Sequence, residues 1–552
     1  MIGVVANPAE HDAVREFFEL FKTPWEFYRR DRQYEVLLCS ADDPVDETAK
    51  LILFYAGTRV QFDDEHQIQT GRQRSPASIL SYKRTRIPIY GNAITFPEEA
   101  TGLLTHEDSQ ECSAYLDRSG DRFRARIGYD IFKEVHTLLT VGQPPTNANL
   151  PALDLHIAFL RDLITGCGVP LVEVPPAPDK HRFIACLTHD VDHPSICQHK
   201  WDHTMFGFLY RAVLGSLRNF IRGRIPRRTL LANWTAALKL PFVYLGLAKD
   251  FWLEFDGRYL AMEKGLPSTF FVIPFKDRPG RNATGLAPRH RASRYGAADI
   301  ASHIQTLTSA DREIGLHGID AWLDSSNGQK ELEEIRRLTE MQDIGVRMHW
   351  LYFDERSPVT LEKAGADYDS TVGYNGTVGY RAGTSQAYKP FQAIRLLELP
   401  LMIMDTALFF PGYLDLSFRE ASKRVDNIIN HAVQFGGTVT VNWHDRSVAP
   451  ERCWDEFYTD LVDELKSKEA WFATGKQAVS WFRKRRSVVF ETVDADSTTV
   501  RVKVAAEADD KLPGLLLRVH RPGEQPQDTA ISAGTRCVDL FFAQKELQNI
   551  NA

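Results

Sequence analysis

The chain has 552 residues, of which 43% are hydrophobic, and a formal net charge of −7. This length exceeds what one hydrophobic core usually serves, so we expect two or three domains. The negative net charge gives no general attraction to nucleic acid, and we expect no nucleic-acid partner. The seven cysteines include no Cys-x-x-Cys pair, which indicates reduced thiols and excludes a zinc knuckle of that type.

Residues 1–178 are predicted to form an N-terminal α+β domain of unknown role. Short apolar strands over 34–40 and 86–91 are interspersed with helical stretches over 12–21 and 153–166. The first residues lack the basic segment followed by an apolar segment that is typical of a secretion signal. The chain also has no run of eighteen apolar residues that would indicate a membrane-spanning helix. We therefore expect a cytoplasmic protein.

Residues 179–485 are predicted to form a parallel (β/α) barrel, because strand-like and helix-like segments alternate there. Four prolines within 169–181 predict the boundary that precedes it. The expected strands are 182–190, 268–274, 313–318, 345–351, 366–371, 396–405 and 437–445. After 485, strand-like pieces predict a small β-rich domain over 486–552. The predicted fold class is therefore α/β, a barrel between two smaller domains.

A helical insertion of about 196–262 separates the first two predicted barrel strands and is longer than usual crossovers. Residues 204–228 within it combine six arginines with many large apolar side chains. Such a stretch could form a lid over the site or lie on an anionic membrane surface, but most such helices in soluble proteins simply dock on the core. Membrane-surface contact through 204–228 is therefore an open alternative, and the oligomeric state is not indicated.

Polar residues gather at the ends of the predicted barrel strands. In parallel α/β barrels the carboxyl ends of the strands meet at one face, where side chains from separate strands converge on a ligand. The residues at or near these ends are Asp190, Asp192, His317, Arg347, His349, Asp369, Asp405, His444 and Asp445. Any one of them has an ordinary structural role available, such as capping the next helix. Together they predict an active site.

The residue types at these strand ends suit metal-assisted hydrolysis. Carboxylates and imidazoles bind divalent ions such as zinc, which acidify water and polarise a carbonyl group. Alternation along an extended chain points the carboxylates of Asp190 and Asp192 to one side, so that one can bind metal and the other can take a proton from water. His444 could protonate the leaving group.

The order of several motifs resembles the polysaccharide deacetylase family, which has the NodB-like distorted (β/α) barrel fold. "LTHDVDH" (187–193) resembles its first motif, "EIGLHG" (313–318) its metal-histidine motif, and "GVRMHWL" (345–351) its arginine motif. "STFFVIP", "ELPLMIMD" and "VNWHD" resemble the family's second strand, its later aspartate strand and its final histidine motif. The resemblance covers about 180–485. It implies a hydrolase that removes N-acetyl groups from an amino sugar of a polysaccharide or glycan precursor.

The resemblance also implies a role for each matching residue. Asp190 would be the general base, and Asp192 and His317 would bind the metal. Arg347 would orient the base, and His444 would be the general acid. Two further residues enter as supporting candidates: Asp405 beside His444, and Arg381 in "GYRAGTS" as a second candidate for the arginine role. The metal is expected to be zinc, with manganese or cobalt as alternatives.

One position departs from the family pattern. The family usually has a second metal-binding histidine four residues after the first, and this sequence has Ala321 there. Asp320 is the expected third ligand, and the alternatives are His193, His189 or His349. Because the triad is incomplete, two other functions stay open. One is an allantoinase-like hydrolase of a small amide or cyclic ureide, and the other is a glycan-binding or assembly protein that has lost the metal.

Overall fold

The computed structural model describes residues 1–43, 45, 48–74, 76–97, 103–492, 499–504, 511–531 and 534–539. The chain divides into two compact units. The first contains residues 1–180, 380–391 and those from 480 onward, and the second contains 181–379 and 392–479. The boundary at 180 lies within two residues of the predicted one. The part of the predicted C-terminal domain beyond Asp539 lies outside the described residues.

The first unit is built on a six-stranded sheet in the order β10-β11-β4-β3-β1-β2. All neighbours are parallel except β10 and β11. Its strands are β1 (Ile2–Val5), β2 (Trp25–Phe27), β3 (Val36–Cys39), β4 (Leu51–Tyr55), β10 (Ala114–Ser119) and β11 (Arg122–Ile127). Its longer helices are α1 (His11–Phe21), α3 (Ile131–Thr140) and α4 (Ala152–Gly166). Every residue of β1, β3 and β4 is buried, as expected for parallel strands covered on both faces.

The strands that follow the barrel in sequence belong to this same unit. β26 (Leu515–His520) pairs with β12 (Leu171–Glu173) and with β27 (Gln527–Ile531). β24 (Val489–Thr492), β25 (Thr499–Val504) and β28 (Gly534–Asp539) form another sheet. Because β12 precedes the barrel and β26 follows it, residues from before and after the barrel complete one sheet.

The second unit contains the predicted barrel. Eight parallel strands follow one another in the order β20-β19-β18-β17-β14-β13-β22-β21. They are β13 (Ile184–Val191), β14 (Ser268–Val272), β17 (Glu313–Gly318), β18 (Val346–Met348), β19 (Tyr368–Asp369), β20 (Leu397–Glu398), β21 (Ile403–Met404) and β22 (Thr438–Asn442). β23 (Trp471–Phe472) pairs with β13 off this path. The predicted α/β fold class is confirmed.

The segment 396–405, predicted as one strand, forms two strands at opposite ends of the sheet. The backbone N–H of Leu399 donates to the carbonyl of Asp369 (2.7 Å), beside β20. The N–H of Met402 donates to the carbonyl of Thr440 (3.1 Å), beside β21. Pro400 lies between them and has no N–H to donate, so the ladder is interrupted there. Only residues 399–402 separate the two ends of the sheet, which is therefore curled into a distorted barrel.

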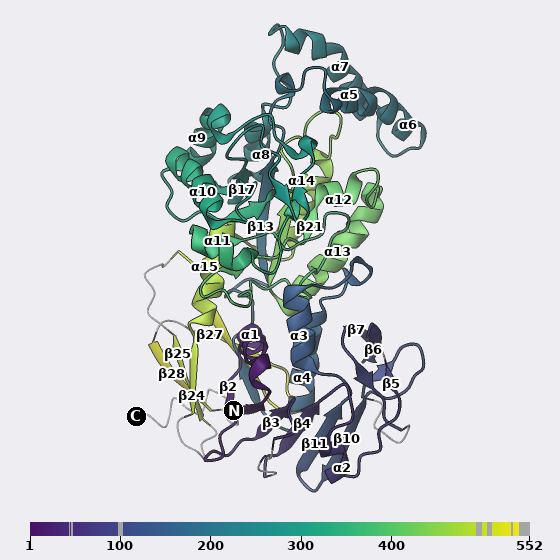
Figure 1. Cartoon of the computed structure of the whole chain (residues 1–552), viewed down its shortest axis with the longest axis vertical. Helices are drawn as coiled ribbons and strands as arrows, with labels where there is room; N and C mark the ends of the chain where they lie inside the picture. Colours follow the sequence, from purple (N-terminus) through teal and green to yellow (C-terminus); the bar gives the residue numbers. More distant parts are fainter. Residues whose placement is uncertain are drawn as a thin grey trace. The chain divides into compact units, whose positions relative to one another are not determined.

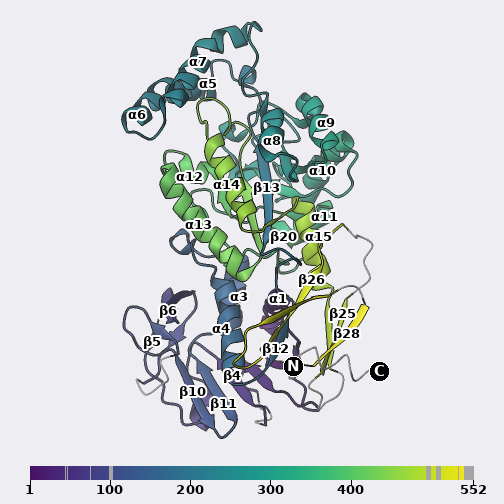
Figure 2. The same cartoon turned by 180° about the vertical axis from the view of Figure 1, so that it is seen from behind.

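Helices flank this sheet on two sides. In Figures 1 and 2, α9, α10 and α11 lie on one side of β13, and α12 and α13 lie on the other. Their bounds are α9 (Ala301–Ser309), α10 (Ser325–Thr339), α11 (Ser357–Ala364), α12 (Asp405–Phe409), α13 (Phe418–Phe435), α14 (Asp455–Ser467) and α15 (Gly475–Arg486). The predicted insertion between β13 and β14 consists of α5 (His203–Tyr210), α6 (Ser216–Ile221), α7 (Arg227–Tyr244) and α8 (Phe255–Glu263). Among the described residues, no helix is both long and apolar enough to cross a bilayer.

Candidate metal centre and active site

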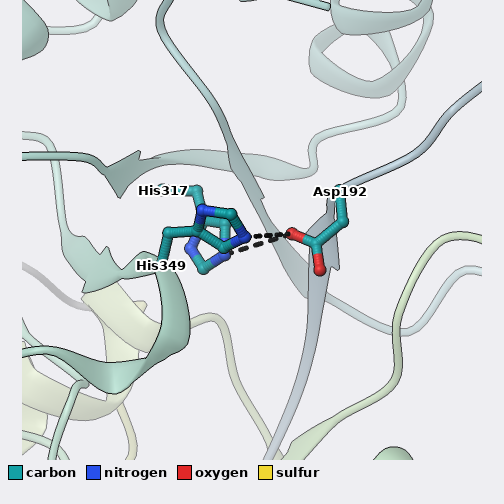
Figure 3. Close-up of side chains that lie close together, drawn as sticks. All are labelled: Asp192, His317 and His349. Carbon is teal, nitrogen blue, oxygen red and sulfur yellow. Dashed lines mark ion pairs between the residues drawn. The ribbon is translucent and has the colours of Figure 1, made fainter. Parts of the chain in front are cut away.

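Three potential metal ligands meet at the carboxyl ends of three strands of this sheet, β13, β17 and β18. Asp192 follows β13, His317 lies in β17, and His349 follows β18. One donor atom from each lies within 4.8 Å of the others. Nε2 of His317 lies 3.3 Å from Oδ1 of Asp192, and Nε2 of His349 lies 3.7 Å from the same oxygen (Figure 3). All three side chains are therefore directed toward one point.

The hydrogen bonds around this cluster favour a cation at that point. Nδ1 of His317 lies 2.9 Å from the carbonyl of Arg347, so in the neutral ring Nδ1 carries the proton and Nε2 presents a lone pair. Oδ1 of Asp192 is buried and accepts no hydrogen bond from the described residues. Burial raises the pKa of Asp192, but the nearby histidines lower it well below its usual value, so the carboxylate is charged. A divalent ion would satisfy both acceptor atoms.

His349 is presented to the cluster by an unusual backbone. The two residues after it, Trp350 and Leu351, have φ values of 66° and 53°, which non-glycine residues rarely adopt. Burial lowers the pKa of His349 well below its usual value, so the ring is neutral and able to bind metal. Arg291 donates from Nη2 to the carbonyls of His349 (2.7 Å) and Ile319 (3.1 Å). It thereby links the loops that follow His317 and His349.

Asp190 is held beside the cluster in a fixed orientation. Its Oδ1 accepts a hydrogen bond from Nη1 of Arg347 (3.0 Å), and its Oδ2 accepts one from Nδ2 of Asn442 (2.6 Å). The Asn442 side chain also accepts from the backbone N–H of Asp190 (3.1 Å). Arg347 is buried, and its other nitrogens donate to Ser370. Each carboxylate oxygen of Asp190 keeps a lone pair for a further partner.

His444 lies on the other side of Asp192. Its Nε2 is 3.7 Å from Oδ2 of Asp192, and its Nδ1 is 2.6 Å from Oδ1 of Asp405. Burial lowers the pKa of His444, but the Asp405 carboxylate raises it more strongly, to about 9. The ring is therefore protonated at neutral pH. A cation at Asp192 would lower this pKa toward the range in which an imidazolium is an effective general acid.

The structure places the predicted third ligand and two of its alternatives outside this cluster. Oδ1 of Asp320 accepts a hydrogen bond from the backbone N–H of Arg281 (2.7 Å). Nδ1 of His193 contacts Nε2 of His199 at 3.2 Å. Nε2 of His189 contacts Glu263 at 2.7 Å inside the core. His349, the remaining alternative, completes the group with Asp192 and His317.

Packing favours a small side chain at position 321, where the family usually has a histidine. Ala321 is fully buried beside two glycines. A methyl group added to Gly318 or to Gly328 would lie 3.5 or 3.4 Å from Cβ of Ala321. Because Ala321 has no exposed surface, an imidazole at this position would have to displace its neighbours, and the second histidine near Asp192 is His349.

Two other predicted strand-end residues, Asp369 and Asp445, form hydrogen bonds within the fold. Asp445 accepts a hydrogen bond from the backbone N–H of His193 (2.8 Å) and Asp369 accepts one from Thr371 (2.5 Å). Burial raises the pKa of both carboxyl groups to about 6. Arg381, the second candidate for the arginine role, falls in the segment 380–391 of the first unit.

Sequence reasoning did not identify Asn442 or Arg291 as site residues. Asn442 ends β22 two residues before His444, so its place in "VNWHD" is a signal that strand-end reasoning could have used. Arg291 ends a single 3₁₀-helical turn (Arg289–Arg291), and only the folded chain brings it to the carbonyls of Ile319 and His349.

No family model and no curated protein matches the sequence. Solved structures similar to the chain include a protein from Mycobacterium smegmatis described as a polysaccharide deacetylase. It is 18% identical, with a TM-score of 0.34, and the match covers 56% of this chain and 95% of that one. A protein from Pseudomonas aeruginosa described in the same way is 15% identical, with a TM-score of 0.35 and coverage of 59% and 98%.

A CE4 family pseudoenzyme from Bacillus anthracis is also similar, at 11% identity and a TM-score of 0.25, with coverage of 56% and 68%. Identities and TM-scores this low say nothing of activity. The distorted barrel itself is established by the strand order and pairing of the second unit.

Proposed function

We propose that this protein is a metal-dependent hydrolase that removes N-acetyl groups from an amino sugar of a polysaccharide or glycan precursor. The observation that carries the proposal is the convergence of Asp192, His317 and His349 between two further polar pairs. One pair is Asp190 with Arg347, and the other is His444 with Asp405. A divalent ion bound by the three ligands would supply Lewis acidity to the acyl oxygen and to water.

Asp190 is suited to take a proton from water. Arg347 and Asn442 fix the plane of its carboxylate, and each oxygen retains a free lone pair. Oδ2 of Asp190 lies 3.9 Å from Nε2 of His317, so the base is adjacent to the ligands without replacing one. A positioned general base of this kind contributes roughly 10²–10⁴-fold to the rate.

His444 is suited to give a proton to the departing amine. Its Nδ1 contacts Asp405, so Nε2 is the nitrogen that faces the cluster. Asp405 also accepts a hydrogen bond from the backbone N–H of His444 (2.7 Å), which fixes the ring in place. A candidate base, Asp190 near His317, and a candidate acid, His444 near Asp192, thus adjoin the same cluster, and cleavage of an amide bond uses one group of each kind.

The choice of an N-acetylated sugar rests on the order of the motifs, which resembles that of the polysaccharide deacetylases.

The test uses the 552-residue chain, stripped of metal and then supplied with Zn²⁺, Mn²⁺ or Co²⁺. Acetate release from N-acetylglucosamine oligomers only after metal is added would support the proposal. Cleavage of allantoin without acetate release would assign the site to the allantoinase-like alternative. Metal binding with neither reaction would contradict the hydrolase.

A further inference from the structure

The insertion between β13 and β14 has a charge opposite to that of the whole chain. Residues 203–249 contain eight arginines and lysines and no aspartate or glutamate, whereas the net charge of the chain is −7. Among the described residues, Arg218, Arg222 and Arg227 form no ion pair, and all three are exposed. This part of the second unit therefore presents concentrated positive charge.

The helix α7 is apolar on two opposite faces. Leu230, Ala236, Leu240 and Val243 are buried on one face, together with Asn233. The opposite face carries a second set at spacings of three and four residues: Leu231, Trp234, Leu238, Phe242 and Leu245. At 100° per residue these five fall within an arc of roughly 80°. They are exposed, and Leu238 has an exposed fraction of 76%.

The preceding helices repeat this pattern. α5, a π-helical turn (Arg211–Gly215) and α6 leave a row of large apolar side chains exposed: Phe206, Tyr210, Leu214, Leu217 and Ile221. Ile221 has an exposed fraction of 75%. Single exposed apolar residues are ordinary, but contiguous rows of them indicate a surface that is covered in the functional state.

The buried side of the insertion is anchored near the candidate active site. Asn233 in α7 accepts a hydrogen bond from the backbone N–H of Glu451 (2.7 Å), in the loop that follows His444. Arg211 pairs with Glu451, and Arg228 pairs with Glu456. Figures 1 and 2 show α5, α6 and α7 extending beyond α14 and away from the barrel sheet. The exposed rows are therefore carried by a supported arm rather than by a loose segment.

We propose that the arm of residues 203–249 docks on the surface of an anionic lipid bilayer. Exposed leucine, phenylalanine and tryptophan side chains would enter the boundary between headgroups and acyl chains, while the arginines would contact anionic headgroups. A second copy of the chain is disfavoured as the occupant, because two arms that each carry eight cations and no carboxylate would repel. Nucleic acid would leave the rows of leucines in water. No helix of the arm is long and apolar enough to span the bilayer.

The test is co-sedimentation of the 552-residue chain with vesicles. Phosphatidylcholine vesicles are compared with vesicles that contain about one third phosphatidylglycerol, because each cation near an anionic surface contributes roughly fivefold to binding. We expect strong, salt-sensitive binding only to the anionic vesicles. The double variant Arg218→Gln/Arg222→Gln should bind about 25-fold more weakly. Its matched control, Lys330→Gln/Lys363→Gln, changes two exposed lysines of α10 and α11 and should bind as the parent does.

The apolar contribution is tested by Leu238→Ser/Ile221→Ser, which should weaken binding at least tenfold, since each side chain buries apolar area in the bilayer. The control Leu286→Ser/Ile394→Ser removes two side chains that are 83% and 82% exposed elsewhere on the second unit, and it should bind as the parent does. The proposal is overturned if the parent binds neither vesicle, or if the arm variants bind as tightly as their controls. Light scattering tests self-association. If the parent protein is a dimer and Leu238→Ser/Ile221→Ser is a monomer, the surface is assigned to self-association instead.

Discussion

Arg347 fixes His317 through its backbone and Asp190 through its side chain. The carbonyl oxygen of Arg347 lies 2.9 Å from Nδ1 of His317, and its Nη1 lies 3.0 Å from Oδ1 of Asp190. Because β17 pairs with β18 at His317 and Arg347, one backbone position aligns both the proposed metal ligand and the proposed base. The orientation of the two chemical groups is therefore coupled through one residue.

We expect His349→Ala to abolish tight metal binding, whereas Asp320→Ala should leave it intact. His349 points at Asp192, and Asp320 is engaged by the backbone of Arg281. Removal of a residue that only supports a ligand weakens metal binding by roughly 10–100-fold, and removal of a ligand itself should weaken it more. Competition with a chelator, read by metal analysis, measures both affinities. Loss of metal from Asp320→Ala with retention in His349→Ala would restore Asp320 as the ligand.

Arg291→Lys should weaken metal binding by roughly 10–100-fold without removing a ligand. Arg291 uses Nη2 for the carbonyls of Ile319 and His349 and Nη1 for that of Pro279, whereas lysine has one nitrogen on a different geometry, so the common anchor of the two ligand loops is weakened. The same chelator competition measures this effect. Arg294→Lys is the control, because Arg294 is exposed and pairs with Asp277. Equal affinities in the two variants would show that Arg291 does not position the ligands.

Asp190→Asn should lower acetate release by roughly 10²–10⁴-fold while leaving metal bound. Asparagine preserves the shape and the contacts to Arg347 and Asn442 in part, but it cannot accept a proton at neutral pH. The measurement pairs the initial rate with metal content on the same preparation. A variant within a few-fold of the parent rate would exclude Asp190 as the base.

Ala321→His should destabilise the second unit by about 1–3 kcal/mol and should not tighten metal binding. The position is fully buried against Gly318 and Gly328, so the larger side chain would have to displace its neighbours. Thermal unfolding and chelator competition test the two parts separately. Ala321→Ser adds one oxygen and serves as the small control. Tighter metal binding by Ala321→His would show that the family position is still open to a ligand.

The first unit should become less stable at acidic pH, because Glu173 becomes protonated. Burial would raise the pKa of Glu173, but Arg161 and His520 lower it to about 2 in the folded state, below its ordinary value of 4.5. The pair therefore stabilises the fold above pH 4.5, and this contribution is lost as the pH falls toward 2. Glu173→Gln should cost on the order of 2–3 kcal/mol at neutral pH, and the difference from the parent should shrink below pH 4.5.

Equilibrium urea unfolding at neutral pH and near pH 3, with Glu333→Gln as an exposed control in α10, measures this difference. A Glu173→Gln deficit that is the same at both pH values would contradict the proposed pKa shift.

Local patterns in the sequence were sufficient to predict the barrel, its strands and most of the residues at their ends. The alternation of apolar strands with helices predicted the order of elements, and the Asp-x-Asp spacing predicted that Asp190 and Asp192 point to one side, where both lie near Nε2 of His317. These features depend on neighbours in the chain, which is why the sequence alone reveals them. The division of 396–405 into two strands was not predicted, because an apolar run does not show which partner each half will pair with.

Only the tertiary structure decided which histidine joins the cluster. Asp320 is nearer to His317 in sequence, but the loop geometry turns it to Arg281, whereas the parallel pairing of β17 with β18 brings His349 within reach of Asp192. Packing around Ala321 was equally invisible in the sequence, because the two glycines beside it matter only once β17 and α10 are in contact. Ligand sets depend on register between strands and on the space left by packing, and neither is encoded in local spacing.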